Sequence, residues 1–286
     1  MNEIRIPYGS QPSQFGELRI PSGPGPHPVV IVIHGGFWYD RYGLDLMHAV
    51  SDVLTARGYA TWNIEYRRVG EDGGGWPETL IDVGNAADHL KVLAQKYELD
   101  LSRVVTMGHS AGGHLALWSA ARHKSAAFLE QHAGVSQMGS PETDTSPESP
   151  LRIHGAISLA GVNDLRLMWE IRQEQSPVVD FLGGIPSVFP NRYAAASPME
   201  LLPLGLPQVL VHGTDDDRVP LQISEHYYNA AMEMGDPVTM IELPGVEHFK
   251  LIQPTSEAWP PIVTALDELF AAIESNPSSA LNRSES

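Results

Sequence analysis

Cysteine is absent from this 286-residue chain. Its absence excludes disulfide bonds, a thiolate nucleophile and a cysteine-ligated zinc site. Chains without disulfides are typical of reducing compartments, so we expect a cytoplasmic protein. The first residues, MNEIRIPYGS, lack a charged stretch followed by an apolar one, and we therefore expect no secretory signal.

Positive charge and long apolar runs are also scarce. The chain has 18 Lys and Arg residues against 35 Asp and Glu residues, which gives a formal net charge of −17. A field of this sign repels nucleic-acid phosphates and anionic lipid headgroups. No apolar run approaches the ~18 residues that a membrane-spanning helix needs. We therefore expect neither nucleic acid nor a membrane as a partner.

Short apolar runs alternate along the chain with longer stretches of helical periodicity. Val29 to Ile33 is β-branched and uniformly apolar, as in a strand buried on both faces. Further strands are predicted at Tyr59 to Tyr66, Arg103 to Met107, Gly155 to Ala160, Gln208 to His212 and Val238 to Leu243. Helices are predicted at Gly43 to Arg57, Pro77 to Tyr97, Ser110 to Arg122, Leu221 to Met234 and Ser256 to Ile273. This alternation predicts an α/β fold, with a mostly parallel central sheet and helices on both faces.

Several segments depart from the alternation. Gln14 to Ile20 has the period of an antiparallel edge strand. Gly134 to Pro150 is polar and predicts a mobile loop. Residues 162–202 contain helical patches broken by glycines and prolines, which we interpret as a small helical cap over one end of the sheet. We therefore predict a single domain over residues 1–275 with this cap inserted, followed by a flexible tail at 276–286.

The segment Gly108-His109-Ser110-Ala111-Gly112 lies between a predicted strand and a predicted helix. In this context G-x-S-x-G predicts a sharp turn that lifts Ser110 Oγ above the sheet edge. Glycines at both ends lack the Cβ atoms that would clash in such a turn. The free N–H groups at the helix start favour negative charge at the same point. Ser110 is therefore the candidate nucleophile, and a glycine-rich turn with an incidental serine is the alternative.

Donors for an oxyanion are expected from the loop His34-Gly35-Gly36-Phe37-Trp38, which follows the buried strand Val29 to Ile33. Its two glycines allow the backbone to approach a substrate oxygen closely. The amides of Gly36, Phe37 and Ala111 are the candidate oxyanion hole. His34 is expected to brace this loop by hydrogen bonding.

A serine hydroxyl is a weak nucleophile and requires a base that is oriented by an acid. His248 follows the last predicted strand, so it reaches the same sheet edge as Ser110 and is the candidate base. The acid is expected in the loop after Gln208 to His212. Three adjacent aspartates lie there, and spacing alone does not select one of them: Asp215, Asp216 and Asp217.

The motifs HGGFW, GHSAGGHLAL, HGTDDDRVP and GVEHF, in this order, resemble those of the α/β-hydrolase superfamily from about Val29 to Phe270. The family pattern H-G-x-x-D-x-x-V-P implies Asp216 as the acid. Asp217, then Asp215, and more remotely Asp164 are the alternatives. Within the superfamily the motifs look like the esterase, arylformamidase (kynurenine formamidase) and prolyl-oligopeptidase-like branches.

The resemblance implies a serine hydrolase in which Ser110, Asp216 and His248 form the catalytic triad. Our leading hypothesis is a carboxylesterase (EC 3.1.1.-) that works through an acyl-enzyme. The alternative is an arylformamidase or a small-peptide amide hydrolase, and a third possibility is a binding protein that kept the fold. The expected partner is a small-molecule ester or amide substrate, and the expected assembly is a monomer or homodimer.

Candidate substrate contacts are Phe37, Trp38 and His109, with internal packing as the alternative for each. A second set of apolar side chains either lines a substrate pocket under the cap or packs within it: Met138, Met168, Trp169, Phe181, Leu182 and Phe189. The remaining histidines lack metal-ligand spacing, and Gly70 to Pro77 matches no phosphate- or dinucleotide-binding motif. We therefore expect no metal and no cofactor.

Overall fold

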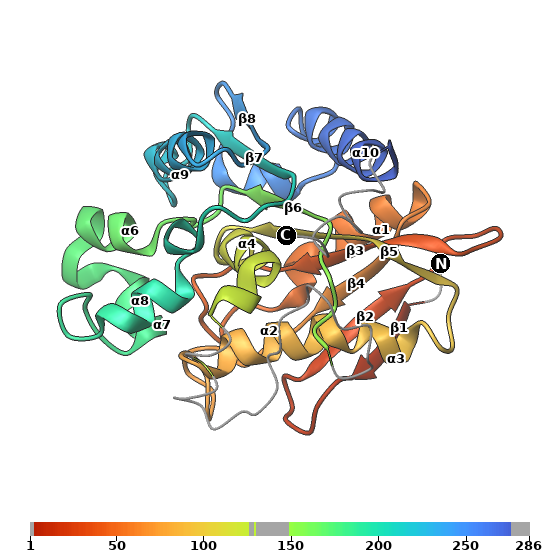
Figure 1. The fold of residues 1–286 in the computed structure, drawn as a ribbon, viewed down its shortest axis with the longest axis horizontal. Helices are drawn as coiled ribbons and strands as arrows, with labels where there is room; N and C mark the ends of the chain where they lie inside the picture. Colours follow the sequence, from red (N-terminus) through yellow and green to blue (C-terminus); the bar gives the residue numbers. More distant parts are fainter. Residues whose placement is uncertain (1–2, 126–128, 130–148, 276–286) are drawn as a thin grey trace, which may run out of the picture.

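Eight strands of the described chain form one sheet at the centre of the molecule (Figure 1). The computed structural model describes residues 3–125, 129 and 149–275. The strands are β1 (Glu3–Pro7), β2 (Phe15–Arg19), β3 (His27–Ile33), β4 (Ala60–Ile64), β5 (Leu99–His109), β6 (Gly155–Leu159), β7 (Gln208–Gly213) and β8 (Val238–Leu243). Their order in the sheet is β1-β2-β4-β3-β5-β6-β7-β8. All pairs from β4 to β8 are parallel, whereas β2 pairs antiparallel with β1 and β4.

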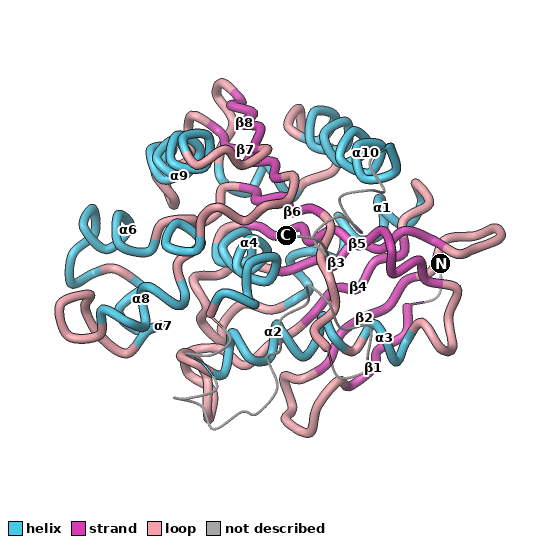
Figure 2. Tube along the Cα trace, viewed as in Figure 1, coloured by secondary structure: helices cyan, strands magenta, loops and turns pink. Residues whose placement is uncertain are grey.

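Helices cover both faces of this sheet (Figure 2). The α-helices of the described residues are α1 (His48–Ala56), α2 (Glu78–Asp88), α3 (Leu90–Leu93), α4 (Ala111–Ala121), α6 (Leu165–Arg172), α7 (Pro177–Leu182), α8 (Pro190–Ala196), α9 (Leu221–Glu233) and α10 (Trp259–Ser275). Short 3₁₀ helices are η1 (Leu44–Met47), η2 (Arg122–Lys124), η3 (Gln173–Gln175), η4 (Pro198–Leu201) and η5 (His248–Ile252). The predicted α/β class is confirmed.

Strand β1 was not expected from the sequence, and its presence corrects the position of β2. The predicted strand at Gln14 to Ile20 is antiparallel, but it lies second from the edge because β1 pairs with its outer side. None of the five residues of β1 is fully buried. A strand of this kind depends on pairing more than on burial, so its hydrophobic pattern is weak.

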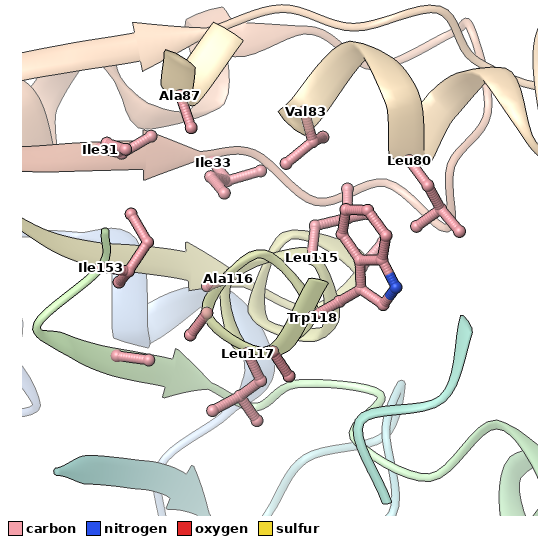
Figure 3. Close-up of a cluster of buried hydrophobic side chains, with 14 of the residues drawn as sticks. Ile31, Ile33, Leu80, Val83, Ala87, Leu115, Ala116, Leu117, Trp118 and Ile153 are labelled. Carbon is pink, nitrogen blue, oxygen red and sulfur yellow. The ribbon is translucent and has the colours of Figure 1, made fainter. Parts of the chain in front are cut away.

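The core has two layers, one on each face of the sheet. Val30 and Val32 of β3 pack with α1 and α10, while Val29, Ile31 and Ile33 pack with α2, α4 and α9. This alternation follows from the period of two along a strand. Figure 3 shows the second layer, in which the side chains of α4 lie against those of β3 and α2.

Helix α4 is buried on every side, since all eleven of its residues are inaccessible. Its sequence, AGGHLALWSAA, therefore lacks the polar stripe of a surface helix. Strands β3, β5 and β6, helix α2 and helix η4 all contact it. Its first residue follows Ser110 directly, so the start of this helix is held by the centre of the core.

Helices α6, α7 and α8, which lie within the predicted cap segment, gather beyond the edge to which the parallel strands run (Figure 1). The Trp76 N–H donates to the Phe181 carbonyl at 2.8 Å, and the Tyr39 hydroxyl donates to the Asp180 carboxylate. These contacts join α7 to the loops that follow β3 and β4. Most of the predicted mobile loop at Gly134 to Pro150, and the whole predicted tail, lie outside the described residues.

Of the helices in the described part of the chain, none has both the length and the apolar character that crossing a bilayer requires.

Leu117 lies on α4 and is fully buried in the second core layer (Figure 3). We expect Leu117→Ala to lower the free energy of unfolding by about 2–5 kcal/mol, because it removes buried methyl groups and leaves a cavity. Met232 on α9 is 51% exposed, and Met232→Ala should change stability by no more than about 0.5 kcal/mol. Urea unfolding midpoints at unchanged slope measure both. Equal losses would contradict this account of the core.

Candidate active site

Ser110 joins β5 to α4 in a strained backbone conformation. Its φ and ψ angles are 59° and −119°, in a region that residues with a Cβ atom rarely adopt. Its N–H donates to the Leu159 carbonyl at 2.8 Å. Its own carbonyl accepts from His114 N at 3.1 Å and from Val162 N at 3.3 Å. Bonds to β6, to the segment after β6 and to α4 therefore hold the turn that the G-x-S-x-G motif predicted.

Glycines allow the surrounding backbone to approach this turn. A Cβ atom at Gly108 would lie 2.0 Å from the Gly112 carbonyl oxygen, and one at Gly112 would lie 2.1 Å from the Ile33 oxygen. A Cβ atom at Gly35 would lie 2.9 Å from Ser110 Cβ. Each distance is well below van der Waals contact, so a side chain at any of these positions would separate the layers. The loop after β3 and the turn at Ser110 are therefore in direct contact.

The candidate oxyanion donors lie around this contact. Gly36, Phe37 and Trp38 have successive φ values of 109°, 53° and 62°, an unusual run that turns the loop back beside Ser110. The hydrogen bonds found between described residues do not use the Gly36 or Phe37 N–H. Ala111, as the first residue of α4, has no acceptor within its helix. The three amides can thus serve an oxygen held beside the serine.

His248 and Asp216 are brought together by the loops after β8 and β7. His248 Nδ1 lies 2.6 Å from Asp216 Oδ2, and the two side chains are only 4% and 1% exposed. Asp216 Oδ1 accepts from the N–H groups of Arg218 and Val219, each at 2.8 Å. Neither His248 Nε2 nor Ser110 Oγ takes part in a hydrogen bond within the described residues. The reacting atoms of the candidate nucleophile and base are therefore not bonded to another described residue.

The other carboxylates considered for the acid role have different positions. Asp215 is exposed, and Asp217 is exposed and pairs with Arg218 at 3.3 Å. Asp164 caps the N-terminus of α6 and pairs with His226 Nδ1 at 2.9 Å. Of these four aspartates, only Asp216 is bonded to His248.

The environment of Asp216 keeps its carboxylate ionised. Burial by itself raises the pKa of Asp216, but hydrogen bonds from His212 and His248 outweigh it, and the pKa lies well below its ordinary value. His212 Nε2 is 3.3 Å from Asp216 Oδ2, and His212 Nδ1 contacts Ser224 Oγ at 2.8 Å. The carboxylate can therefore orient His248 and stabilise a positive charge on it.

Two of the candidate substrate contacts, Trp38 and His109, are buried. Trp38 is fully buried, with its ring stacked 4.5 Å from Phe181 and edge-on to His114. His109 is 1% exposed, and its Nε2 lies 3.0 Å from the His248 carbonyl oxygen. Burial, together with the neighbouring His248, holds the pKa of His109 well below its usual range. Both side chains have packing positions, because the layers around α4 close over them; Phe37 alone stays partly accessible.

The apolar side chains predicted at the cap divide in the same way. Met168, Phe181 and Leu182 are completely buried and belong to the core, whereas Trp169 and Phe189 remain partly exposed. Met168, Phe181 and Leu182 therefore pack inside the protein. Met138 lies outside the described residues.

Glu65 is a positioning residue that sequence reasoning missed. Its Oε1 lies 2.7 Å from His34 Nε2, and its Oε2 accepts from Leu44 N at 3.0 Å. Tyr66 stacks on the His34 ring at 4.4 Å and donates to the His34 carbonyl at 2.9 Å. Burial by itself raises the pKa of Glu65, but pairing with His34 and Arg68 lowers the pKa by more, so the pKa lies below its ordinary value. The signal in the sequence was a charged residue near the end of the predicted strand Tyr59 to Tyr66.

One group in the described chain has a spacing that suits a metal ion: Glu3, Glu17 and His48. Arg19 pairs with both carboxylates there, and its positive charge offsets one of their two negative charges. The group lies on β1, β2 and α1, away from the strand ends that carry Ser110, and we assign it no part in the candidate site.

The depressed pKa of Asp216 predicts a pH-dependent stability difference. The stabilisation is fully present above the unfolded pKa of about 3.9 and is lost as pH falls through the lower folded pKa. At pH 7 we expect Asp216→Asn to be less stable than the wild type by about 1.5–3 kcal/mol, and the difference should shrink below about pH 4. Urea unfolding at several pH values measures it. Asp217→Asn, at an exposed site, should match the wild type throughout, and a deficit of Asp216→Asn that is independent of pH would contradict the assignment.

Solved structures show the same fold. A truncated carbohydrate esterase from gut microbiota matches with a TM-score of 0.79 at 19% identity, covering 95% of this chain and 97% of that one. Esterase B from Lactobacillus rhamnosis matches with a TM-score of 0.79 at 20% identity, covering 96% and 88%. These likenesses confirm the α/β-hydrolase fold.

Curated relatives have a higher sequence identity to this chain than those two structures. Esterase LipC of Mycobacterium tuberculosis is 28% identical over 256 residues, which are 85% of this chain and 59% of LipC. The probable isoprenylcysteine alpha-carbonyl methylesterase ICME of Oryza sativa is 27% identical, over 84% of this chain and 56% of that protein. The chain thus spans little more than half the length of these relatives. The BD-FAE family matches residues 19–231, and the chain belongs to this family.

Proposed function

We propose that this protein is a serine hydrolase that cleaves carboxylic esters through an acyl-enzyme on Ser110. The observation that carries the proposal is the 2.6 Å contact between His248 Nδ1 and Asp216 Oδ2, in a loop that also touches the residue beside Ser110. The names of the relatives support it, since LipC is called an esterase and LipM a probable carboxylic ester hydrolase. The cysteine-free composition supports a cytoplasmic location.

In the first half-reaction His248 Nε2 takes the Ser110 hydroxyl proton while Oγ bonds to the carbonyl carbon. The carbonyl π electrons move to oxygen, and the amides of Gly36, Phe37 and Ala111 bind the resulting oxyanion. When the carbonyl re-forms, the bond to the alcohol oxygen breaks and His248 returns the proton to that oxygen. The alcohol leaves and the acyl group stays on Ser110.

In the second half-reaction water replaces the alcohol. His248 takes a proton from the water, whose oxygen bonds to the acyl carbon, and the bond to Ser110 Oγ breaks as His248 reprotonates the serine. Asp216 remains ionised throughout, because its depressed pKa keeps the negative charge opposite the imidazolium. Neutral His109, which is bonded to the His248 carbonyl, adds no competing positive charge.

Ser110→Ala tests the nucleophile. We expect kcat/KM for p-nitrophenyl butyrate to fall at least about 10³-fold, because no hydroxyl is left to form the acyl-enzyme. Ser119→Ala is the matched control, since Ser119 is a buried serine on α4 whose hydroxyl has no hydrogen-bond partner among the described residues. It should retain activity. Full ester hydrolysis by Ser110→Ala would contradict the proposal, and much faster turnover of N-formylkynurenine than of the ester would favour an arylformamidase.

Glu65→Gln tests the support of the oxyanion loop. The substitution keeps the side-chain shape but leaves one oxygen acceptor for the two contacts of the carboxylate, and it removes the charge opposite His34. We expect kcat to fall about 10-fold with little change in KM, less than the ~10²–10³ lost when a donor is removed outright. Glu98→Gln, at an exposed position, should leave kcat unchanged. A Glu65→Gln enzyme with normal kcat would show that this contact does not position the loop.

A further inference from the structure

Arg172 is the last residue of α6 and lies between two loops of the candidate site. Its guanidinium carbon is 5.7 Å from the centre of the Phe37 ring. One of its nitrogens, Nη2, donates to the carbonyl of Arg218, next to the loop residue Asp217. Phe37 belongs to the candidate oxyanion loop, and Arg218 N bonds to Asp216. Arg172, at the end of α6, therefore contacts both the loop of the candidate oxyanion donors and the loop that carries Asp216.

No carboxylate of the described residues pairs with Arg172, although the chain carries a net charge of −17. On the same helix, Arg166 pairs with Glu200 and donates to the Pro190 carbonyl. A guanidinium has five N–H donors in a planar fork, and the Arg218 carbonyl occupies only part of that capacity. A half-buried arginine without an acidic partner, beside a candidate catalytic centre, is a group that can receive an anion from outside.

The backbone at both ends of α6 fixes the point from which this side chain extends. Gln173, the next residue, has a φ of 53°, and its N–H donates to the Trp169 carbonyl. A residue with a Cβ atom rarely adopts this region. At the other end of α6, the Asp164 carboxylate accepts from two N–H groups of the first turn at 3.0 Å each. Both ends of the helix are thus held, and Arg172 is held with them.

We propose that Arg172 binds a carboxylate carried by the substrate, so that the preferred ester is anionic. This inference rests on the proposed ester hydrolysis and adds the substrate class to it. The planar guanidinium matches the two oxygens of a carboxylate. The net charge of −17 repels anions at long range. The preference for an anionic ester therefore comes from local pairing with Arg172. The Phe37 ring lies against the guanidinium, and the same residue belongs to the loop of the candidate oxyanion donors.

The test compares matched esters. Mono-p-nitrophenyl succinate and p-nitrophenyl butyrate place a carboxylate or a methyl group on the acyl chain. The pair 4-carboxyphenyl butyrate and phenyl butyrate places the carboxylate on the leaving group. We expect Arg172→Gln to lower kcat/KM about 10-fold for the anionic member of one pair, mainly through KM, and at most 2-fold for the neutral member. Arg172→Lys should fall between, and Arg166→Gln should match the wild type.

Equal losses for the anionic and neutral esters would overturn the proposal, because they would show that Arg172 only supports the Arg218 loop. No loss in either pair would overturn it as well. If the wild type hydrolysed none of these esters, the proposed function would fail on its own. Calorimetric titration with the mono-anilide of succinate would then decide the inference: binding that is at least about 10-fold weaker in Arg172→Gln supports it, and equal or absent binding contradicts it.

Discussion

The close contact between the turn at Ser110 and the loop after β3 is the constraint on which the rest of the site depends. Gly35, Gly108 and Gly112 allow backbone to meet backbone at distances that no side chain would permit. The strain at Ser110 persists because bonds to Leu159 and Val162 and the fully buried helix α4 surround it. A core helix thus directs its N-terminus at the point where an oxyanion would form.

Charge around this contact is arranged through buried groups. Asp216 and Glu65 are carboxylates whose pKa values lie below the ordinary range, and each faces a histidine. Asp216 holds His248, which belongs to the proposed chemistry, whereas Glu65 holds His34, which belongs to the oxyanion loop. Two similar pairs therefore lie at different parts of the site, one at the candidate base and one at the loop of the candidate oxyanion donors.

The cap segment is tied to the same loops by aromatic packing. Trp38 packs against Phe181 of α7 and His114 of α4, so this residue connects α7 to the core. Phe37, its neighbour, remains accessible beneath Arg172.

The central sheet and the loops that carry the candidate site were predictable because their signals are local. Strand β8 has the bounds that its hydrophobic pattern predicted, and Ser110, Asp216 and His248 each follow a parallel strand. Carboxyl ends of parallel strands share one edge of a sheet, so chain order alone indicated that these residues would meet. The choice of Asp216 came from the family motif, and the structure explains it by its bond to His248.

Other features arose only from tertiary contacts. Strand β1 exists through its pairing with β2, and Trp38 is buried by Phe181, a residue far away in the chain. His34 follows β3, and its partner Glu65 follows β4. The sequence by itself determined the α/β class and which loops carry the candidate nucleophile, acid and base, because strand pattern and glycine turns are encoded locally. Only the tertiary structure decided which aspartate meets the base and which side chains are buried, because those outcomes depend on the packing of segments that are distant in sequence.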